Sequence, residues 1–128
     1  MILLDTCTLI WLTSDLARIS ERAKGRITEF RDSLHVSPVS ALEIALKRRK
    51  RKLALPLDTE RWFQNALHQH GLAEIALSSK TAIASTELPA LHEDPFDRIL
   101  VATAMEQNLI LLTPDRLISQ YPGVCCEW

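Results

Sequence analysis

Short uninterrupted runs of aliphatic residues constrain the fold of this chain more than any other feature. Ile2-Leu3-Leu4 opens the sequence, and a second run covers Leu109–Leu112 near its end. Strands with one solvated face alternate apolar and polar residues, whereas continuous runs are typical of parallel strands that are covered on both faces. Helical patterns separate these runs, and no two of the expected strands are close enough for a hairpin. The sequence therefore predicts an α/β sandwich with a mainly parallel central sheet.

Capping residues divide the rest of the chain into helices. Pro38 and Pro95 each follow a residue whose side chain can cap a helix, and proline favours the first helical position. Gly71 is typical of a helix end. The expected strands cover residues 1–5, 34–36, 72–77, 109–112 and 124–126. The expected helices run from Thr6 or Thr8 to Leu12, then over 20–31, 37–52, 58–71, 78–86 and 94–107, with a last one from Asp115 to before Pro122.

The composition fits one domain over residues 1–128. The chain is long enough to bury a core but too short for two comparable domains. No apolar run approaches the ~20 residues that span a bilayer. The N-terminal run is broken by Asp5 and lacks a basic segment, so it does not fit a secretory signal. Because no run is long enough to span a bilayer, no membrane association is expected. The three cysteines show no disulfide or zinc pattern, which favours a reducing cytoplasm.

Charge is distributed unevenly along the chain. The net charge is −1, yet residues 47–52 are six consecutive basic residues, so the remainder is acidic. Six successive helical residues point in all directions, so this helix must end here or project beyond the core. The segment could be a solvated helix end, or it could attract phosphate groups.

Four acidic residues occupy positions from which their carboxylates could face one pocket. Asp5 and Asp115 each follow an apolar strand, and Glu43 and Asp97 lie near helix starts that follow strands. In open α/β sheets, the functional site lies beyond the carboxyl ends of the strands. Four converging carboxylates would repel one another severely without a counter-cation, and a hard divalent ion is their natural partner. This pattern predicts a metal-dependent active site.

Asp5 and Asp115 also have a purely structural interpretation, as N-caps of the helices that follow them. Asp5 could cap the next helix, although a charge directly after three buried aliphatics favours a functional role. Asp115 could be the N-cap of the last helix. For Asp115 the sequence leaves both interpretations open.

The two helical carboxylates have structural alternatives as well. Ser40 and Glu43 match a capping box, but a helix start at Ser37 would leave Glu43 inside the helix without that role. Asp94 precedes Pro95 and is an ordinary N-cap. Asp97 could act through a capping box or the helix dipole, or it could belong to the site.

These residues lie in motifs that resemble a PIN-domain nuclease, specifically the VapC-type ribonuclease toxin of bacterial type II toxin–antitoxin systems. The resemblance covers essentially the whole chain. Its most specific part is Leu91-His-Glu-Asp-Pro-Phe-Asp-Arg-Ile-Leu-Val-Ala-Thr-Ala104, followed by Leu111-Leu-Thr-Pro-Asp115 and Tyr121. The segments Leu3-Leu-Asp-Thr6, with Trp11, and Ser40-Ala-Leu-Glu-Ile-Ala-Leu-Lys47 match in order and spacing.

The resemblance implies a PIN-like α/β/α sandwich and a specific chemistry. Asp5, Glu43, Asp97 and Asp115 would bind Mg²⁺ or Mn²⁺ for hydrolysis of RNA phosphodiesters, with Asp5 and Asp97 as the first choices for direct ligands. Glu43 and Asp115 would act through water or as further ligands. The supporting residues would be Thr6, Thr113 and Asp94.

The basic segment would bind RNA in this interpretation, through Lys47, Arg48 and Arg51. Lys47 lies one helical turn from Glu43, so an i,i+4 ion pair is the alternative. Three positions depart from the family pattern: Leu42 replaces a common Trp, Arg51 a usual Gly, and Pro114 a basic residue. None of these changes removes a carboxylate.

Two other functional classes are compatible with parts of the pattern. A phosphatase of the haloacid-dehalogenase type would need a second Asp two residues after Asp5, where the chain has Cys7. A non-catalytic PIN-fold module for nucleic-acid binding or regulation would have lost carboxylates, and none is lost. The four histidines could also suggest a metal site, but His68 and His70 point to different helix faces, which favours solvated positions.

The resemblance also implies protein partners: a cognate antitoxin and a second copy of the chain in a homodimer. A small domain cannot bury every apolar residue, and one set clusters around the first, third and fourth helices. Part of it could form a groove for an apolar antitoxin helix, or the set could complete the core. Its members are Trp11, Leu12, Ile44, Leu53, Leu55, Trp62 and Phe63.

Overall fold

The computed structural model describes residues 1–128 and has a five-stranded sheet at its centre. The middle strand is β1 (Ile2–Leu4), with β2 (Leu34–Val36) on one side and β4 (Ile110–Leu112) on the other. β3 (Ala73–Glu74) and β5 (Cys125–Glu127) form the two edges. All four strand pairings are parallel. The predicted parallel sheet is therefore confirmed.

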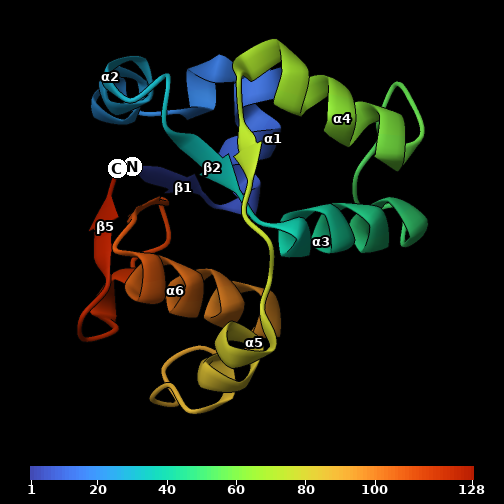
Figure 1. Ribbon diagram of the computed structural model, residues 1–128. Coiled ribbons are helices and arrows are strands. Elements are labelled where there is room, and N and C mark those ends of the chain that lie inside the picture. Colours follow the sequence, from blue (N-terminus) through green and yellow to red (C-terminus); the bar gives the residue numbers. More distant parts are fainter.

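Helices cover both faces of this sheet (Figure 1). One face carries α1 (Thr6–Ser14), α2 (Glu21–Glu29) and α4 (Thr59–His70), and the other carries α6 (Pro95–Gln107), against which α5 (Ser79–Thr86) packs. α3 (Pro38–Arg49) contributes to the packing on both sides. These layers form the predicted α/β/α sandwich.

The continuous aliphatic run of β1 supplies both hydrophobic cores. Ile2 and Leu4 pack in the core under α1, α2 and α4, whereas Leu3 packs in the core under α6. All three side chains are fully buried, and each such burial contributes roughly 1.5–3 kcal/mol. Successive strand side chains point to opposite faces, which explains why an uninterrupted apolar run is needed here.

Helix ends follow the capping signals, with one departure. Ser37, Asp58 and Asp94 cap α3, α4 and α6 as expected, and Gly71 ends α4 with a φ of 62°. α3 ends at Arg49 rather than at residue 52. The chain turns there because Arg51, two residues beyond the helix, adopts the left-handed conformation with a φ of 57°.

Two predicted elements are shorter in the structure. β3 contains two residues instead of the six expected at 72–77, because only two residues of this exposed edge pair with β2. The predicted α-helix after Asp115 is wrong: the segment forms only a 3₁₀ turn, Ile118–Gln120. Pro122 leaves too few residues for a stable α-helix at this point. A second 3₁₀ turn, Leu16–Arg18, follows α1.

Most of the apolar set proposed for a groove completes the core instead. Leu12, Ile44, Trp62 and Phe63 are buried in the core under α1, α2 and α4, and Leu53 and Leu55 pack against it. Trp11 is half-buried, edge-on to Trp128 with ring centroids 5.9 Å apart. A cavity of about 430 Å³ does lie between α3 and α4, but of that set only Phe63 lines it; the other lining residues include Ala41, Leu42, Ala45 and Gln64.

None of the helices combines the length and the apolarity needed to cross a bilayer. Cys7, Cys125 and Cys126 are all free thiols.

Candidate active site

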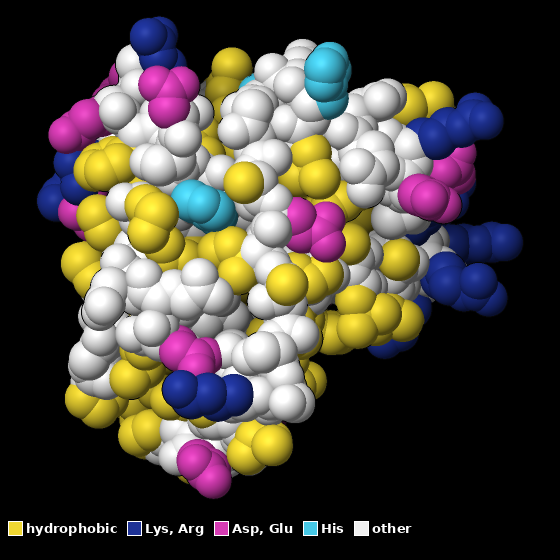
Figure 2. Space-filling model, viewed as in Figure 1, with side chains coloured by type: hydrophobic (Ala, Val, Ile, Leu, Met, Phe, Trp, Pro, Cys, Tyr) yellow, Lys and Arg dark blue, Asp and Glu magenta, His cyan; other side chains and the backbone are white.

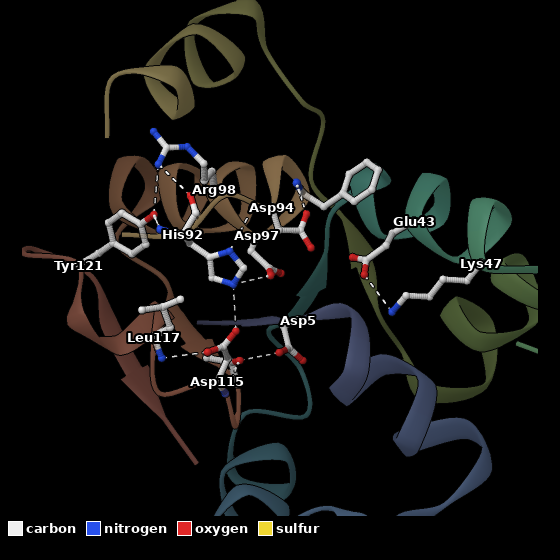
Figure 3. Close-up of polar contacts among 12 residues, drawn as sticks. Asp5, Glu43, Lys47, His92, Asp94, Asp97, Arg98, Asp115, Leu117 and Tyr121 are labelled. Carbon is white, nitrogen blue, oxygen red and sulfur yellow. Dashed lines mark hydrogen bonds and ion pairs between the residues drawn. The ribbon is translucent and has the colours of Figure 1, made fainter. Parts of the chain in front are cut away.

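Four carboxylates from four separate elements meet at the carboxyl edge of the sheet (Figure 3). Asp5 follows β1, and Asp115 follows β4 by three residues. Asp97 lies in the first turn of α6, and Glu43 reaches toward the same space from α3. The structure thus brings together the four residues that the sequence placed in one pocket.

Asp5 has a structural role at the same time as its place in the site. It is the N-cap of α1, in place of the expected Thr6 or Thr8, and its Oδ1 accepts the N–H of Thr8 at 2.7 Å. Its Oδ2 accepts the hydroxyl of Thr113 at 2.5 Å. Burial raises the pKa of Asp5 in spite of these hydrogen bonds, and the charge of Glu43 adds to the effect. Both oxygens are therefore oriented by the protein in a place where negative charge is unfavourable.

Asp94 caps α6 and Asp97 does not, which settles the capping alternative that the sequence left open for Asp97. Asp94 is the N-cap of α6 and accepts the N–H of Phe96 at 2.9 Å. Asp97 makes no capping bond; its Oδ2 lies 3.0 Å from Nε2 of His92. Burial raises the pKa of Asp97 to about 7, with further contributions from the charges of Asp94 and Glu43. A neighbouring cation would therefore stabilise the ionised form of Asp97.

Glu43 lies inside α3, so the capping-box interpretation is wrong. The cap is Ser37, which accepts the N–H of Val39 at 3.1 Å. Oε2 of Glu43 is 3.0 Å from Nζ of Lys47, one helical turn away. Oε1 is buried and has no hydrogen-bond partner. A buried carboxylate oxygen without a donor is costly, and a bound cation would satisfy it.

Asp115 does not cap an α-helix. Its Oδ1 accepts the N–H of Leu117 at 2.9 Å in the turn before the 3₁₀ segment, and its own N–H donates to Thr113 at 3.1 Å. Its Oδ2 lies 3.2 Å from Nε2 of His92. The carboxylate is thus held by a local turn and by a residue from a distant loop.

His92 is the site residue that the interpretation of the sequence missed. Its Nε2, together with carboxylate oxygens of Asp97 and Asp115, forms a group whose atoms all lie within 4.8 Å of one another. Its position two residues before the α6 cap, inside the motif at residues 91–104, was the available signal. The loop that carries it folds back over the site, and the sequence does not specify that path.

Other predicted residues lie nearby in different roles. The hydroxyls of Thr6 and Ser40 are 3.0 Å apart and join α1 to α3, so Thr6 supports the site through the helices rather than through a carboxylate. Arg48 and Arg51 are exposed and form no ion pair. Lys and Arg side chains project from the molecule where α3 ends (Figure 2).

The residues present fit a divalent cation. Carboxylate oxygens are the ligands that Mg²⁺ and Mn²⁺ prefer, and here several are buried beside one another. The pKa values of Asp5 and Asp97 are raised, and Glu43 has an unpaired buried oxygen. A cation among these groups would offset all three unfavourable features.

The PIN domain family model matches residues 2–124 of this chain. Ribonuclease VapC22 of Mycobacterium tuberculosis (strain ATCC 25618 / H37Rv) is 29% identical over 121 residues, which cover 94% of this chain and 91% of that protein. Its similarity extends across nearly the full length of both proteins.

Solved structures share the architecture. DNA-bound VapBC from Salmonella typhimurium matches with a TM-score of 0.72 and 20% identity, covering 99% of this chain and 98% of that chain. VapBC2 from Rickettsia felis, bound to a DNA fragment from their promoter, matches with a TM-score of 0.73 and 15% identity at the same coverage. At these identities the similarities show the fold alone.

Proposed function

The chain belongs to the PIN domain family, and we propose that it is a divalent-metal-dependent ribonuclease that hydrolyses RNA phosphodiesters as the toxin of a toxin–antitoxin pair. The observation that carries the proposal is the convergence of Asp5, Glu43, Asp97 and Asp115 on one space, with an unpaired buried oxygen on Glu43. A relative of nearly the same length is named a ribonuclease, which supports RNA as the substrate.

Asp5 and Asp97 are the proposed direct ligands of the cation. Each presents a carboxylate that burial makes unfavourable as a free anion. Glu43 and Asp115 would hold the cation through water or as additional ligands. When bound, Mg²⁺ or Mn²⁺ would activate water for attack and offset the negative charge that develops on the phosphate.

A basic pocket beside the carboxylates supports an RNA backbone as the ligand. A cavity of about 170 Å³ between α3 and α6 is lined by the carboxylates Glu43 and Asp94 together with Lys47, Lys50 and Lys52. A phosphate entering it would meet ammonium groups at the rim of the site. Lys50 and Lys52 thus join Lys47 as candidate RNA contacts, whereas Arg48 and Arg51 do not line this pocket.

The partner assignments belong to the same proposal. Structures similar to this chain are described as VapBC complexes and as a toxin–antitoxin complex from Klebsiella pneumoniae. We extend to this chain a cognate antitoxin and a homodimer. Its RNA substrate places it in the cytoplasm, where the three free cysteines would stay reduced.

Cleavage of RNA by the purified protein tests the proposal. A 5′-labelled structured RNA is incubated with the protein in EDTA, Mg²⁺ or Mn²⁺. We expect cleavage only with a divalent ion, and none with Asp5→Asn. RNA binding without cleavage under every condition would instead identify a non-catalytic nucleic-acid-binding module.

A further inference from the structure

His92 occupies a position between two carboxylates of the site (Figure 3). Its Nε2 lies 3.0 Å from Oδ2 of Asp97 and 3.2 Å from Oδ2 of Asp115. These two carboxylates come from different elements, α6 and the segment after β4. The imidazole is therefore a direct bridge between two segments that the sequence separates.

The other ring nitrogen determines which tautomer His92 adopts. Nδ1 lies 3.1 Å from the backbone nitrogen of Asp94, whose N–H points at it. A backbone N–H can only donate, so Nδ1 must be the acceptor, and in a neutral imidazole the hydrogen then resides on Nε2. The Nε2–H group thus donates to Oδ2 of Asp115, while Oδ2 of Asp97 lies within ion-pair distance of the same nitrogen.

This tautomer argues against direct metal ligation by His92. A metal ion at Nε2 would need the lone pair there, and the hydrogen would have to move to Nδ1, where it would face the N–H of Asp94. The ring would lose its bond to Asp94 and gain a repulsive contact. The geometry instead suits a ring that orients carboxylates from outside the metal, as the partners of metal ligands commonly do.

The contact with His92 matters more to Asp97 than to the other carboxylates, because Asp97 has no hydrogen-bond donor of its own. Asp5 accepts hydrogen bonds from Thr8 and Thr113, and Asp115 accepts one from the N–H of Leu117. The carboxylate of Asp97 accepts no hydrogen bond from the protein, and its close polar contact is the 3.0 Å approach of its Oδ2 to Nε2 of His92. Loss of the imidazole would leave its carboxylate free to turn away from its negatively charged neighbours.

The backbone of His92 is held firmly in place. Its N–H donates to Oη of the buried Tyr121 at 2.9 Å, and its carbonyl accepts from Nη1 of Arg98 at 3.2 Å. Arg98 also donates to the carbonyls of Leu88 at 2.8 Å and Ser85 at 3.1 Å. One guanidinium thus ties the α5–α6 loop to α6 while Tyr121 ties it to the C-terminal segment.

We propose that His92 is a positioning residue, which holds the carboxylates of Asp97 and Asp115 at the spacing a divalent cation requires through its Nε2–H group, and that Arg98 and Tyr121 hold His92. The proposal rests on the proposed function, because it concerns the same metal site. It adds a residue of different chemistry to the four carboxylates and assigns it to their orientation.

Two substitutions of His92 distinguish the contribution of Nε2 from that of Nδ1. The amide nitrogen of His92→Gln can reach the place of Nε2 and still donate to the carboxylates. The shorter side chain of His92→Asn reaches only the place of Nδ1. His68→Gln, at an exposed position of α4, is the matched control outside the site, and Asp97→Asn is the control within it.

Mn²⁺ binding at pH 8, followed by the electron paramagnetic resonance of free Mn²⁺, gives the first readout. We expect His92→Gln and His68→Gln to bind close to the unsubstituted protein, and His92→Asn to bind about 10- to 100-fold more weakly. Unchanged binding by His92→Asn would overturn the proposal. So would equal losses in His92→Gln and His92→Asn, since the Nε2–H group would then not be the important feature.

The tautomer itself gives a second readout that needs no substitution to fold. Long-range ¹H–¹⁵N spectra of the protein labelled at histidine should show His92 protonated at Nε2 and unprotonated at Nδ1, both without metal and with Mg²⁺; the spectrum of His92→Gln assigns the signal. Protonation at Nδ1 in either state would overturn the proposal.

The Mn²⁺ measurements distinguish a wrong role for His92 from a wrong metal-dependent function. If Asp97→Asn binds Mn²⁺ more weakly than the unsubstituted protein but His92→Asn does not, the metal site stands and only the role of His92 is wrong. If the unsubstituted protein and Asp97→Asn bind Mn²⁺ equally poorly, the metal-dependent function itself is wrong, and the role of His92 with it.

Discussion

The hydroxyl of Thr113 donates a hydrogen bond of 2.5 Å to Oδ2 of Asp5 across 108 residues of sequence. The same hydroxyl accepts the N–H of Asp115 at 3.1 Å. The contact is possible because β1 and β4 are parallel neighbours, which brings the residues that follow them to the same edge. One buried hydroxyl therefore fixes the orientation of one carboxylate and the start of the segment that carries another.

Substitution of Thr113 tests this link. Thr113→Val keeps the shape of the side chain but removes the donor to Asp5 and leaves the N–H of Asp115 without its partner. We expect a loss of about 1–3 kcal/mol in the free energy of unfolding, and metal binding weaker by about tenfold or more. Thr113→Ser retains the hydroxyl and should behave like the unsubstituted protein in urea unfolding and in Mn²⁺ titration; equal losses for both would contradict the prediction.

Substitution of Asp94 and Asp97 by asparagine should affect the rate of RNA cleavage very differently. Asp97→Asn removes a proposed ligand, and loss of about 3 kcal/mol of transition-state stabilisation lowers the rate by roughly 100-fold. Asp94→Asn keeps a good N-cap and should be far milder. Initial rates of RNA cleavage in Mg²⁺ measure both, and comparable losses would show that the two roles are divided wrongly.

The stability of the metal-free protein should fall as the pH rises from about 4 to about 7. In the unfolded chain Asp97 loses its proton near pH 4, whereas burial raises its pKa in the folded protein to about 7. Between these values the folded state binds more protons, so the free energy of unfolding decreases with increasing pH. Urea unfolding in EDTA should show a flatter pH dependence for Asp97→Asn; an unchanged slope would contradict the assignment.

Metal affinity should respond to pH in the opposite direction. Below about pH 7 a cation must displace the proton of Asp97, so its affinity should increase up to about tenfold per pH unit and level off above that value. Calorimetric Mn²⁺ titrations from pH 5.5 to 8.5 measure this dependence. An affinity that does not vary below pH 7 would show that Asp97 releases no proton on binding.

The side chain of Arg51 should lower the free energy of unfolding relative to glycine at this position, although it adds a positive charge to the basic segment. Its φ is 57°, and its N–H and that of Lys52 bond to the carbonyls of Arg48 and Lys47, an arrangement that usually has glycine at this position. Arg51→Gly should increase the free energy of unfolding by roughly 0.5–1 kcal/mol because a side chain is strained in this conformation.

A helical position nearby provides the control for Arg51. Arg49→Gly removes the same charge from the last residue of α3 and should destabilise the protein by roughly 0.5–1 kcal/mol. If both arginines attract RNA only through charge, the two variants should lose similar RNA affinity while their thermal midpoints move in opposite directions. Midpoints that move together would contradict the strain assigned to Arg51.

Local patterns in the sequence specified most of the elements. Pro38, Gly71 and Pro95 mark helix boundaries that the structure confirms, because capping and left-handed turns depend on a few adjacent residues. The weakest predictions were local too: the helix expected after Asp115 is a 3₁₀ turn, and the strand at 72–77 pairs over two residues. The intrinsic propensity of an edge strand or a short helical segment stabilises it little, so its length depends on the strands and helices that pack or pair with it.

The sequence by itself determined the parallel sheet and the placement of Asp5 and Asp115 at its carboxyl edge, because strand burial and side-chain alternation follow from the order of residues. It left open whether Glu43 caps a helix, and it gave no reason to place His92 beside Asp97. The contact of His92 with Asp97 depends on the path of the α5–α6 loop, which the hydrogen bonds of Arg98 hold in place, whereas the role of Glu43 depends on where α3 begins. Only the tertiary structure could decide them, because a contact between side chains from separate elements depends on how the elements pack and not on the pattern within either one.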